Sequence, residues 1–169
     1  MLNMESIKIS GITPESIVDG EGIRYVIFTQ GCPHHCPGCH NPSTHSFDGG
    51  RIVTIQEILT DIEKNKNYID GITLSGGEPF CQIGQCSVIA EQAQKMGLTV
   101  WCYTGFIFED LYGRTDAIKL LQHIDVLVDG PFILEERSLD LNFKGSSNQR
   151  IIDIQESLRK GVTTLKYII

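Results

Sequence analysis

The sequence predicts an α/β protein, an incomplete (open) parallel β/α barrel of about four to six β/α units. Short apolar runs alternate with segments of helical periodicity, an order typical of parallel sheets with helical crossovers. Motifs rich in glycine, proline or cysteine follow directly after successive runs, at the edge where such folds bind ligands. A complete eight-unit barrel takes about 250 residues. A chain of 169 residues should therefore leave the barrel open along one side.

Apolar runs bounded by turn residues predict the strands. The expected parallel strands are residues 23–30, 71–75, 98–102 and 124–128. Residues 6–10 alternate between apolar and polar and are expected to form an edge strand. Two late candidates are residues 149–154 and 163–168.

Helical periodicity predicts the crossovers. Thr54 and Glu57 have the spacing of a capping box, which predicts a helix over residues 55–65. A second helix carries Val88, Ile89, Ala93 and Met96 and ends at Gly97, and a third carries Ala117, Leu120 and Leu121. Residues 133–145 are expected to form a loop with some helix. No repeat or linker divides the chain, so residues 1–169 should be one domain.

The composition indicates a soluble protein of the cytoplasm. Hydrophobic residues make up 41% and charged residues 21%, and no apolar run approaches the roughly 20 residues that span a bilayer. The net charge of −7, without a Lys/Arg cluster, argues against a nucleic-acid partner. The opening residues lack the pattern of a signal peptide. The six cysteines should accordingly be reduced thiols or ligands rather than disulfides.

A cysteine-rich loop follows the first predicted parallel strand. Cys32, Cys36 and Cys39 have the spacing C-x3-C-x2-C. Thiolates are soft ligands that suit iron–sulfur clusters, zinc or Cu(I). A structural zinc site closes four positions, and an ordinary [4Fe-4S] cluster uses four cysteines. Three cysteines on such a cluster would leave one iron open to a substrate.

The residues of this loop are also compatible with two other kinds of site. A Cys3His zinc site could recruit one of four nearby histidines, which are His34, His35, His40 and His45. A thioredoxin-like redox pair could use Cys36 and Cys39. Pro42 opposes the second interpretation, because it disfavours the helix that lowers a thiolate pKa in such motifs.

Gly76-Gly77-Glu78-Pro79 follows the second predicted parallel strand. A lone Gly-Gly pair is often only a tight exit from a strand. Here it offers close backbone approach together with a carboxylate at the ligand-binding edge. Carbonyl groups and a carboxylate both accept hydrogen bonds from an ammonium group, so an amine is the ligand that this motif suits.

Together, the two motifs resemble the radical S-adenosylmethionine (SAM) superfamily. The stretches at residues 31–43, 103–105, 125–132 and 145–150 are similar, more specifically, to its glycyl-radical-activating members that serve anaerobic ribonucleoside-triphosphate reductase. The similarity spans nearly the whole chain. It implies a [4Fe-4S] cluster and SAM as cofactors, and an open barrel of the radical SAM type.

The resemblance also implies the site residues. The cluster ligands would be Cys32, Cys36 and Cys39, and no catalytic side chain is implied beyond the cluster and SAM. The SAM contacts would be Gly76, Gly77 and Glu78 at the amine, Thr104 and Gly105 beside it, and backbone groups of Gly38, Cys39 and His40 at the adenosyl part. Many members of the superfamily carry an aromatic residue where this chain has Gly38. No stacking role is therefore assigned there.

The implied reaction is reductive cleavage of SAM to a 5′-deoxyadenosyl radical. That radical would abstract hydrogen from a backbone glycine in the large subunit of the reductase. The implied partners are this subunit and a low-potential electron donor, for example one of flavodoxin type. A homodimer is compatible with this picture, and neither a nucleic acid nor a membrane is expected as a partner.

Other functions stay open at this point. The chemistry also suits a small-molecule radical SAM enzyme such as a deazaguanine-forming synthase. From a different class, a zinc-binding module or an iron–sulfur electron carrier would use the same loop. Cys81, Cys86 and Cys102 are expected to be buried small hydrophobic residues, and the sequence assigns no role to Arg24 or Asp129.

Overall fold

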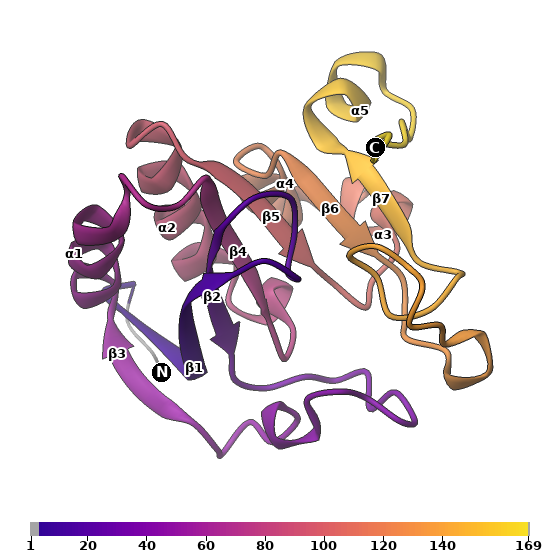
Figure 1. Cartoon of the computed structure of the whole chain (residues 1–169), viewed down its shortest axis with the longest axis horizontal. Coiled ribbons are helices and arrows are strands. Elements are labelled where there is room, and N and C mark those ends of the chain that lie inside the picture. The colour runs from indigo at the N-terminus through magenta and orange to yellow at the C-terminus, as the bar shows by residue number, and fades with distance from the viewer. Residues whose placement is uncertain (1–3, 169) are drawn as a thin grey trace.

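Within residues 4–168, which the computed structural model describes, a seven-stranded mixed sheet runs in the order β3-β1-β2-β4-β5-β6-β7 (Figure 1). Residues 1–3, on which part of the signal-peptide expectation rests, lie outside the described residues. The strands are β1 (Ser6–Ser16), β2 (Arg24–Thr29), β3 (Arg51–Thr54), β4 (Gly71–Gly76), β5 (Thr99–Tyr103), β6 (Val126–Asp129) and β7 (Arg150–Asp153).

The centre of the sheet is parallel, as the sequence predicts. β2 pairs with β4, β4 with β5 and β5 with β6, all in parallel register. These strands form at the four predicted apolar runs. Ile27, Leu74 and Leu127 are wholly buried in them, because a parallel strand packed on both faces has no polar side.

Both edges of the sheet are antiparallel, so the sheet is mixed and only its centre has the predicted parallel arrangement. β1 pairs antiparallel with β2, since the seven residues between Ser16 and Arg24 are too few for a crossover of about a dozen residues. β3 pairs antiparallel with β1 on its outer side, so β1 is not the edge strand. β7 re-enters at the end where β6 leaves, with Arg150 opposite Asp129, and is antiparallel for that reason.

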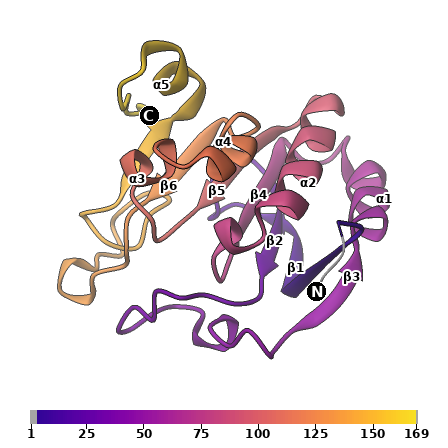
Figure 2. The ribbon, with the colours of Figure 1, turned by 180° about the vertical axis from the view of Figure 1, so that it is seen from behind.

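Helices cover one face of the sheet, as Figure 2 shows from behind. They are α1 (Ile55–Asn65), α2 (Ile83–Lys95), α3 (Phe108–Tyr112) and α4 (Thr115–Leu121), with α5 (Ile154–Lys160) beyond β7. The predicted capping box begins α1, since Thr54 Oγ1 accepts from Glu57 N–H at 3.1 Å and Glu57 accepts from Thr54 N–H at 2.8 Å. No helix of residues 4–168 combines the length and apolar character needed to cross a bilayer.

The last two predicted strands have different outcomes. Residues 149–154 do form β7, but its last residue, Asp153, caps α5, which the sequence analysis missed along with α3 and β3. Residues 163–168 are not a strand. They meet β7 at a single bridge, Ile152 to Leu165, and leave Leu165 57% and Tyr167 93% exposed. A β-rich composition forms a strand only where it has apolar surface to bury.

The motifs gather at one edge of the sheet. The cysteine loop follows β2, Gly76 ends β4, Thr104 follows β5 and Gly130 follows β6. In Figure 1 the segment after β2 passes beneath the sheet, and the segment from 130 to 149 projects to the right. This segment is irregular apart from a short 3-10 turn, Leu134–Glu136, in agreement with a loop that holds some helix. Two further 3-10 turns are Pro42–Thr44 and Pro79–Cys81.

Candidate metal centre and ligand cleft

Backbone hydrogen bonds close the cysteine loop on itself directly after β2. Gly31 N–H donates to Thr44 O at 2.8 Å, and Cys32 N–H donates to His45 O at 3.1 Å. Gly31 has φ +101°, and a Cβ there would lie 2.4 Å from the ring of Phe47. Only glycine fits that close approach without strain. The loop therefore leaves β2 and folds back on itself within a few residues.

The three cysteines line one cavity of about 120 Å³. All three are free thiols, with Cys32 buried and Cys36 and Cys39 half-buried. Burial raises the pKa of the Cys32 thiol, and the nearby Glu78 charge adds to the effect. A set of three soft donors on one cavity fits an iron–sulfur cluster in its chemistry.

Among the described residues, no three His, Cys, Asp or Glu side chains are close enough to hold a single metal ion. A cubane places each thiolate on a different iron, so its ligands need not meet at one atom. Of the four histidines of the zinc interpretation, His34 and His45 line the cysteine cavity. His34 faces Glu78, the rings of His35 and His45 are 5.4 Å apart, and His40 packs on Phe132 at 5.0 Å.

Glu78 lies beside the same cavity and is wholly buried. Its carboxylate accepts hydrogen bonds from Phe80 N–H at 3.0 Å, Gly105 N–H at 2.9 Å and the Thr104 hydroxyl at 2.9 Å. His34 Nε2 donates to Glu78 Oε2 at 2.6 Å. A buried carboxylate is costly unless its oxygens are hydrogen-bonded, and these donors meet that need. The structure thus joins Glu78 to the predicted residues Thr104 and Gly105.

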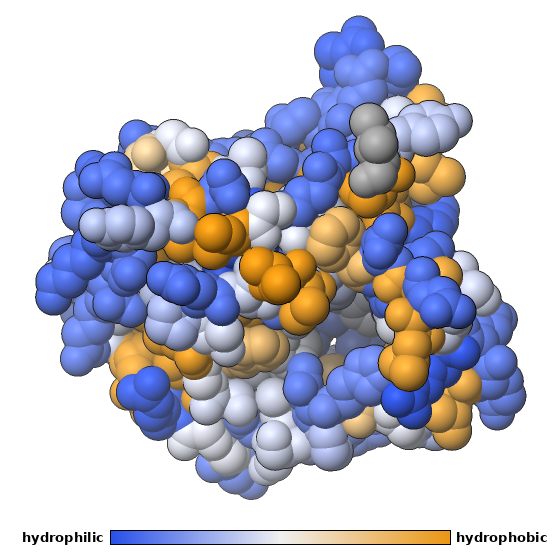
Figure 3. Space-filling view, viewed as in Figure 1, coloured by the Kyte–Doolittle hydropathy of each residue, from blue (hydrophilic) through white to orange (hydrophobic). Residues whose placement is uncertain are grey.

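A wider cleft of about 360 Å³ continues from the cysteine cavity. The two share five lining residues, which are Cys39, Ser75, Tyr103, Phe132 and Gln149. Figure 3 shows a hollow between the sheet and the projecting segment on the right, with apolar surface beside it. The volume falls in the range of about 300–1,000 Å³ that is usual for small-ligand sites.

The structure brings most of the predicted site residues together. Those that line the cysteine cavity are Cys32, Cys36, Cys39, Gly76, Gly77, Thr104 and Gly105. His40 lines the wider cleft beside Cys39. Gly38 lines neither space, and a Cβ there would lie 2.8 Å from Leu134. Its predicted SAM contact stays a prediction.

Gln149 is a lining residue that the sequence analysis missed. Its side chain amide donates to Gly130 O at 3.1 Å and accepts from Gly145 N–H at 2.8 Å. These bonds tie Gln149 to the start of the segment 130–149 and to Gly145, and Gln149 lines both spaces. The stretch 145–150 carried the resemblance to glycyl-radical-activating enzymes, which was the available signal for this residue.

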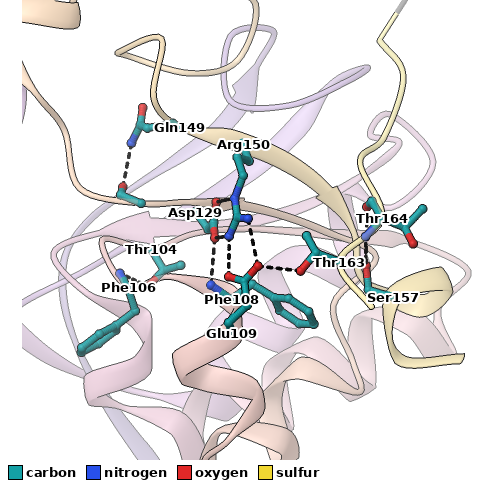
Figure 4. A network of polar contacts seen from close by, with 11 residues as sticks. Thr104, Phe106, Phe108, Glu109, Asp129, Gln149, Arg150, Ser157, Thr163 and Thr164 are labelled. Carbon is teal, nitrogen blue, oxygen red and sulfur yellow. Dashed lines mark hydrogen bonds and ion pairs between the residues drawn. The ribbon is translucent and has the colours of Figure 1, made fainter. Parts of the chain in front are cut away.

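Asp129 lies at the end of β6 and is almost wholly buried. It accepts from Arg150 Nε at 3.0 Å and from Phe108 N–H at 2.8 Å, and Arg150 also forks onto Glu109 at 3.0 and 2.7 Å (Figure 4). The network ties β6, β7 and α3 together. Asp129 therefore supports the segment that closes the cleft, and does not itself line the cleft.

Arg24 is buried without a carboxylate partner in the described residues. It donates to the hydroxyls of Thr73 at 3.2 Å and Thr99 at 2.7 Å and lies 5.9 Å from the centre of the Trp101 ring. Desolvation lowers its pKa to about 10, against the raising effect of Asp70. Its environment is structural rather than part of the cavity.

The cysteines outside the loop divide into two kinds. Cys86 and Cys102 are wholly buried, as expected for small hydrophobic residues. Cys81 is exposed, so the expectation was wrong for that residue. It ends the 3-10 turn Pro79–Cys81, whose first two residues take the buried positions.

The Arg150 network predicts a pH-dependent term in stability. The hydrogen bond from Arg150 holds the pKa of the Glu109 carboxyl at about 2, below its ordinary 4.5. A depressed carboxyl pKa stabilises the fold above the unfolded value, and this contribution is lost as the pH falls from about 4.5 toward 2. Because the Glu109 side chain is 52% exposed, the contribution should be no more than about 1 kcal/mol.

Denaturant unfolding of the parent chain and of Glu109→Gln between pH 6 and pH 3 measures this term. The parent should be more stable at pH 6, and its advantage should shrink steadily toward pH 3. An advantage that is constant across this range would contradict the assignment. Glu91→Gln removes a surface pair with Lys95 at 3.1 Å and serves as the matched control.

Comparisons with known proteins give consistent results. Residues 18–152 match the family described as 4Fe-4S single cluster domain. The chain is 33% identical over 145 residues to the anaerobic ribonucleoside-triphosphate reductase-activating protein of Haemophilus influenzae, covering 82% of this chain and 92% of that one. The proteins of the same name from Vibrio cholerae and Enterobacteria phage T4 are 35% and 32% identical, over 82% and 83% of this chain and 92% and 90% of theirs.

Among solved structures, QueE from Escherichia coli aligns with a TM-score of 0.43 and 16% identity. The alignment covers 59% of this chain and 52% of that one. At this TM-score and identity, the alignment says nothing about the fold or the site of this chain.

Proposed function

Because this chain belongs to the family of anaerobic ribonucleoside-triphosphate reductase-activating proteins, we propose that it generates the glycyl radical of such a reductase by cleaving SAM at a [4Fe-4S] cluster. The chain is then a radical SAM oxidoreductase. The main observation behind the proposal is that three cysteines line one cavity. That cavity continues into a wider cleft, whose volume is usual for a small-ligand site.

Cys32, Cys36 and Cys39 would hold the cluster. When bound, it supplies the electron that splits SAM into methionine and a 5′-deoxyadenosyl radical. With three ligands from the chain, one iron would be left for the amino and carboxylate groups of SAM. Cys32 lies deepest of the three, and its buried position would keep water from that side of the centre.

The other residues would orient SAM. Gly76 and Gly77 allow close backbone approach beside the cluster, and the Glu78 charge would favour the methionyl ammonium nearby. Thr104 and Gly105 line the same cavity. Backbone groups of Gly38, Cys39 and His40 are proposed to meet the adenosyl part, which would extend into the wider cleft that His40 lines.

The target would be a backbone glycine of the reductase large subunit. Helices cover one face of the sheet (Figure 2), and the view from the other side shows the hollow beside the projecting segment (Figure 3), which supports an incomplete barrel that a peptide loop can enter. The reaction needs a low-potential electron donor, and a flavodoxin-like protein is our proposal. We place the reaction in the cytoplasm, and a homodimer stays a prediction.

Anaerobic reconstitution tests the function. The chain, loaded with iron and sulfide and reduced with dithionite, should convert SAM to 5′-deoxyadenosine. With the reductase added, an electron paramagnetic resonance (EPR) spectrum should show a carbon-centred glycyl radical. A fully loaded cluster that leaves SAM intact would contradict the proposal.

The same assay separates the alternatives. A colourless protein with one tightly bound zinc would favour the zinc module, and a brown protein inert toward SAM would favour the electron carrier. Radical transfer to a small molecule without any protein partner would favour an enzyme such as a deazaguanine-forming synthase.

A further inference from the structure

His34 belongs to the polar cysteine loop, but its side chain is packed against other residues instead of facing solvent. It lies between Cys32 and Cys36 in the sequence and lines the cysteine cavity with them, and its side chain is only 17% exposed. The ring packs edge-on against Phe106, with centroids 4.5 Å apart. A Cβ on Gly105 would lie 2.5 Å from the ring, so Gly105 leaves the space that His34 fills.

The hydrogen bond from His34 completes the set of donors on Glu78. A carboxylate has about four lone-pair positions. In the described chain, Phe80 N–H, Gly105 N–H and the Thr104 hydroxyl reach Glu78 from the segments after β4 and β5. The donor that reaches it from the cysteine loop is His34 Nε2, at 2.6 Å. His34 thus links the metal-binding loop to the carboxylate across 44 residues of sequence.

We infer that His34 is a positioning residue that sets the distance between the cluster and the Glu78 carboxylate, and thereby the fit of SAM. The inference rests on the proposed function. SAM would contact the open iron on one side and the Gly76–Glu78 backbone on the other. The cysteine loop and the Gly76–Glu78 segment, which form these two walls, must then keep a fixed separation. Small displacements of aligned groups are costly to binding and reaction. A hydrogen bond between the two walls supplies that constraint.

Removing the link should weaken SAM binding more than it slows the chemical step. In His34→Ala, the loop still carries its three cysteines but loses its tie to Glu78. We expect the KM for SAM to rise about 10- to 100-fold, the range for loss of a hydrogen bond to a charged group. We expect kcat to change less, because Cys32, Cys36 and Cys39 are unchanged. His34→Gln retains an N–H donor at similar reach and should recover most of the affinity.

The experiment compares reconstituted holoenzymes with matched iron content. One readout is KM against kcat for SAM. The second is the EPR spectrum of the reduced cluster, which SAM should perturb at lower concentration in the parent and His34→Gln than in His34→Ala. His35→Asn is the control, since His35 is the exposed neighbour and has φ +49°, a conformation that asparagine tolerates.

The outcomes separate this inference from the proposed function. An unchanged KM and spectrum in His34→Ala, with a fully active parent, would overturn the role of His34 alone. A His34→Gln variant as impaired as His34→Ala would also overturn it. If His34→Ala does not take up iron, His34→Gln with normal iron and near-parental KM supports the inference. A parent that does not cleave SAM would defeat the proposed function instead.

Discussion

Replacement of Cys32, Cys36 or Cys39 by alanine is expected to abolish SAM cleavage. Each thiol lines the one cavity that would hold the cluster, so losing any of them removes one of three anchors. A [4Fe-4S] cluster held by two cysteines should lose iron or be assembled incompletely. Iron and sulfide content, the visible absorption band and 5′-deoxyadenosine formation measure the result. All three should fall to background in each variant.

Cys81→Ala is the matched control for this series. Cys81 is exposed and does not line the cavity, so its variant should keep full iron content and near-parental activity. Loss of cleavage in Cys81→Ala, or normal cleavage in a variant of the loop cysteines, would show that the centre is held by a different set of ligands.

Glu78→Gln should have the second largest effect. The carboxylate is wholly buried and accepts from His34, Phe80, Thr104 and Gly105. A glutamine would turn an amide NH₂ toward these donors and leave buried N–H groups unpaired. The free energy of unfolding should fall by about 3 kcal/mol. The KM for SAM should rise, because the negative charge beside the ammonium site is gone.

Denaturant unfolding and SAM kinetics measure the two effects. Glu15→Gln is the control, because Glu15 is exposed on β1, and its effect on stability should stay within about 0.5 kcal/mol. Parental stability in Glu78→Gln would mean that the four donors do not depend on a charged acceptor. Parental KM would mean that the charge plays no part in binding SAM.

Local signals were sufficient for many of the elements. The capping box of Thr54 and Glu57 placed α1 at its observed bounds, because both hydrogen bonds lie within one turn of helix. The parallel strands formed at their apolar runs, since burial on both faces requires a continuous apolar sequence. β3 was missed because it has only four residues, 51–54, and they are mostly exposed, so they form no apolar run of the kind that predicted the central strands. Pairing with β1 makes them a strand.

The candidate site divides in the same way. The spacing of Cys32, Cys36 and Cys39 predicts a soft-metal loop by itself, because all three cysteines come from one short segment. The sequence also places Gly76 and Gly77 beside that loop, since parallel strands bring their carboxyl ends to one edge. Only the tertiary structure decided that His34 meets Glu78 and that Gln149 lines the cleft. Those contacts join residues far apart in the chain, and the approach of two distant segments depends on the packing of every element between them.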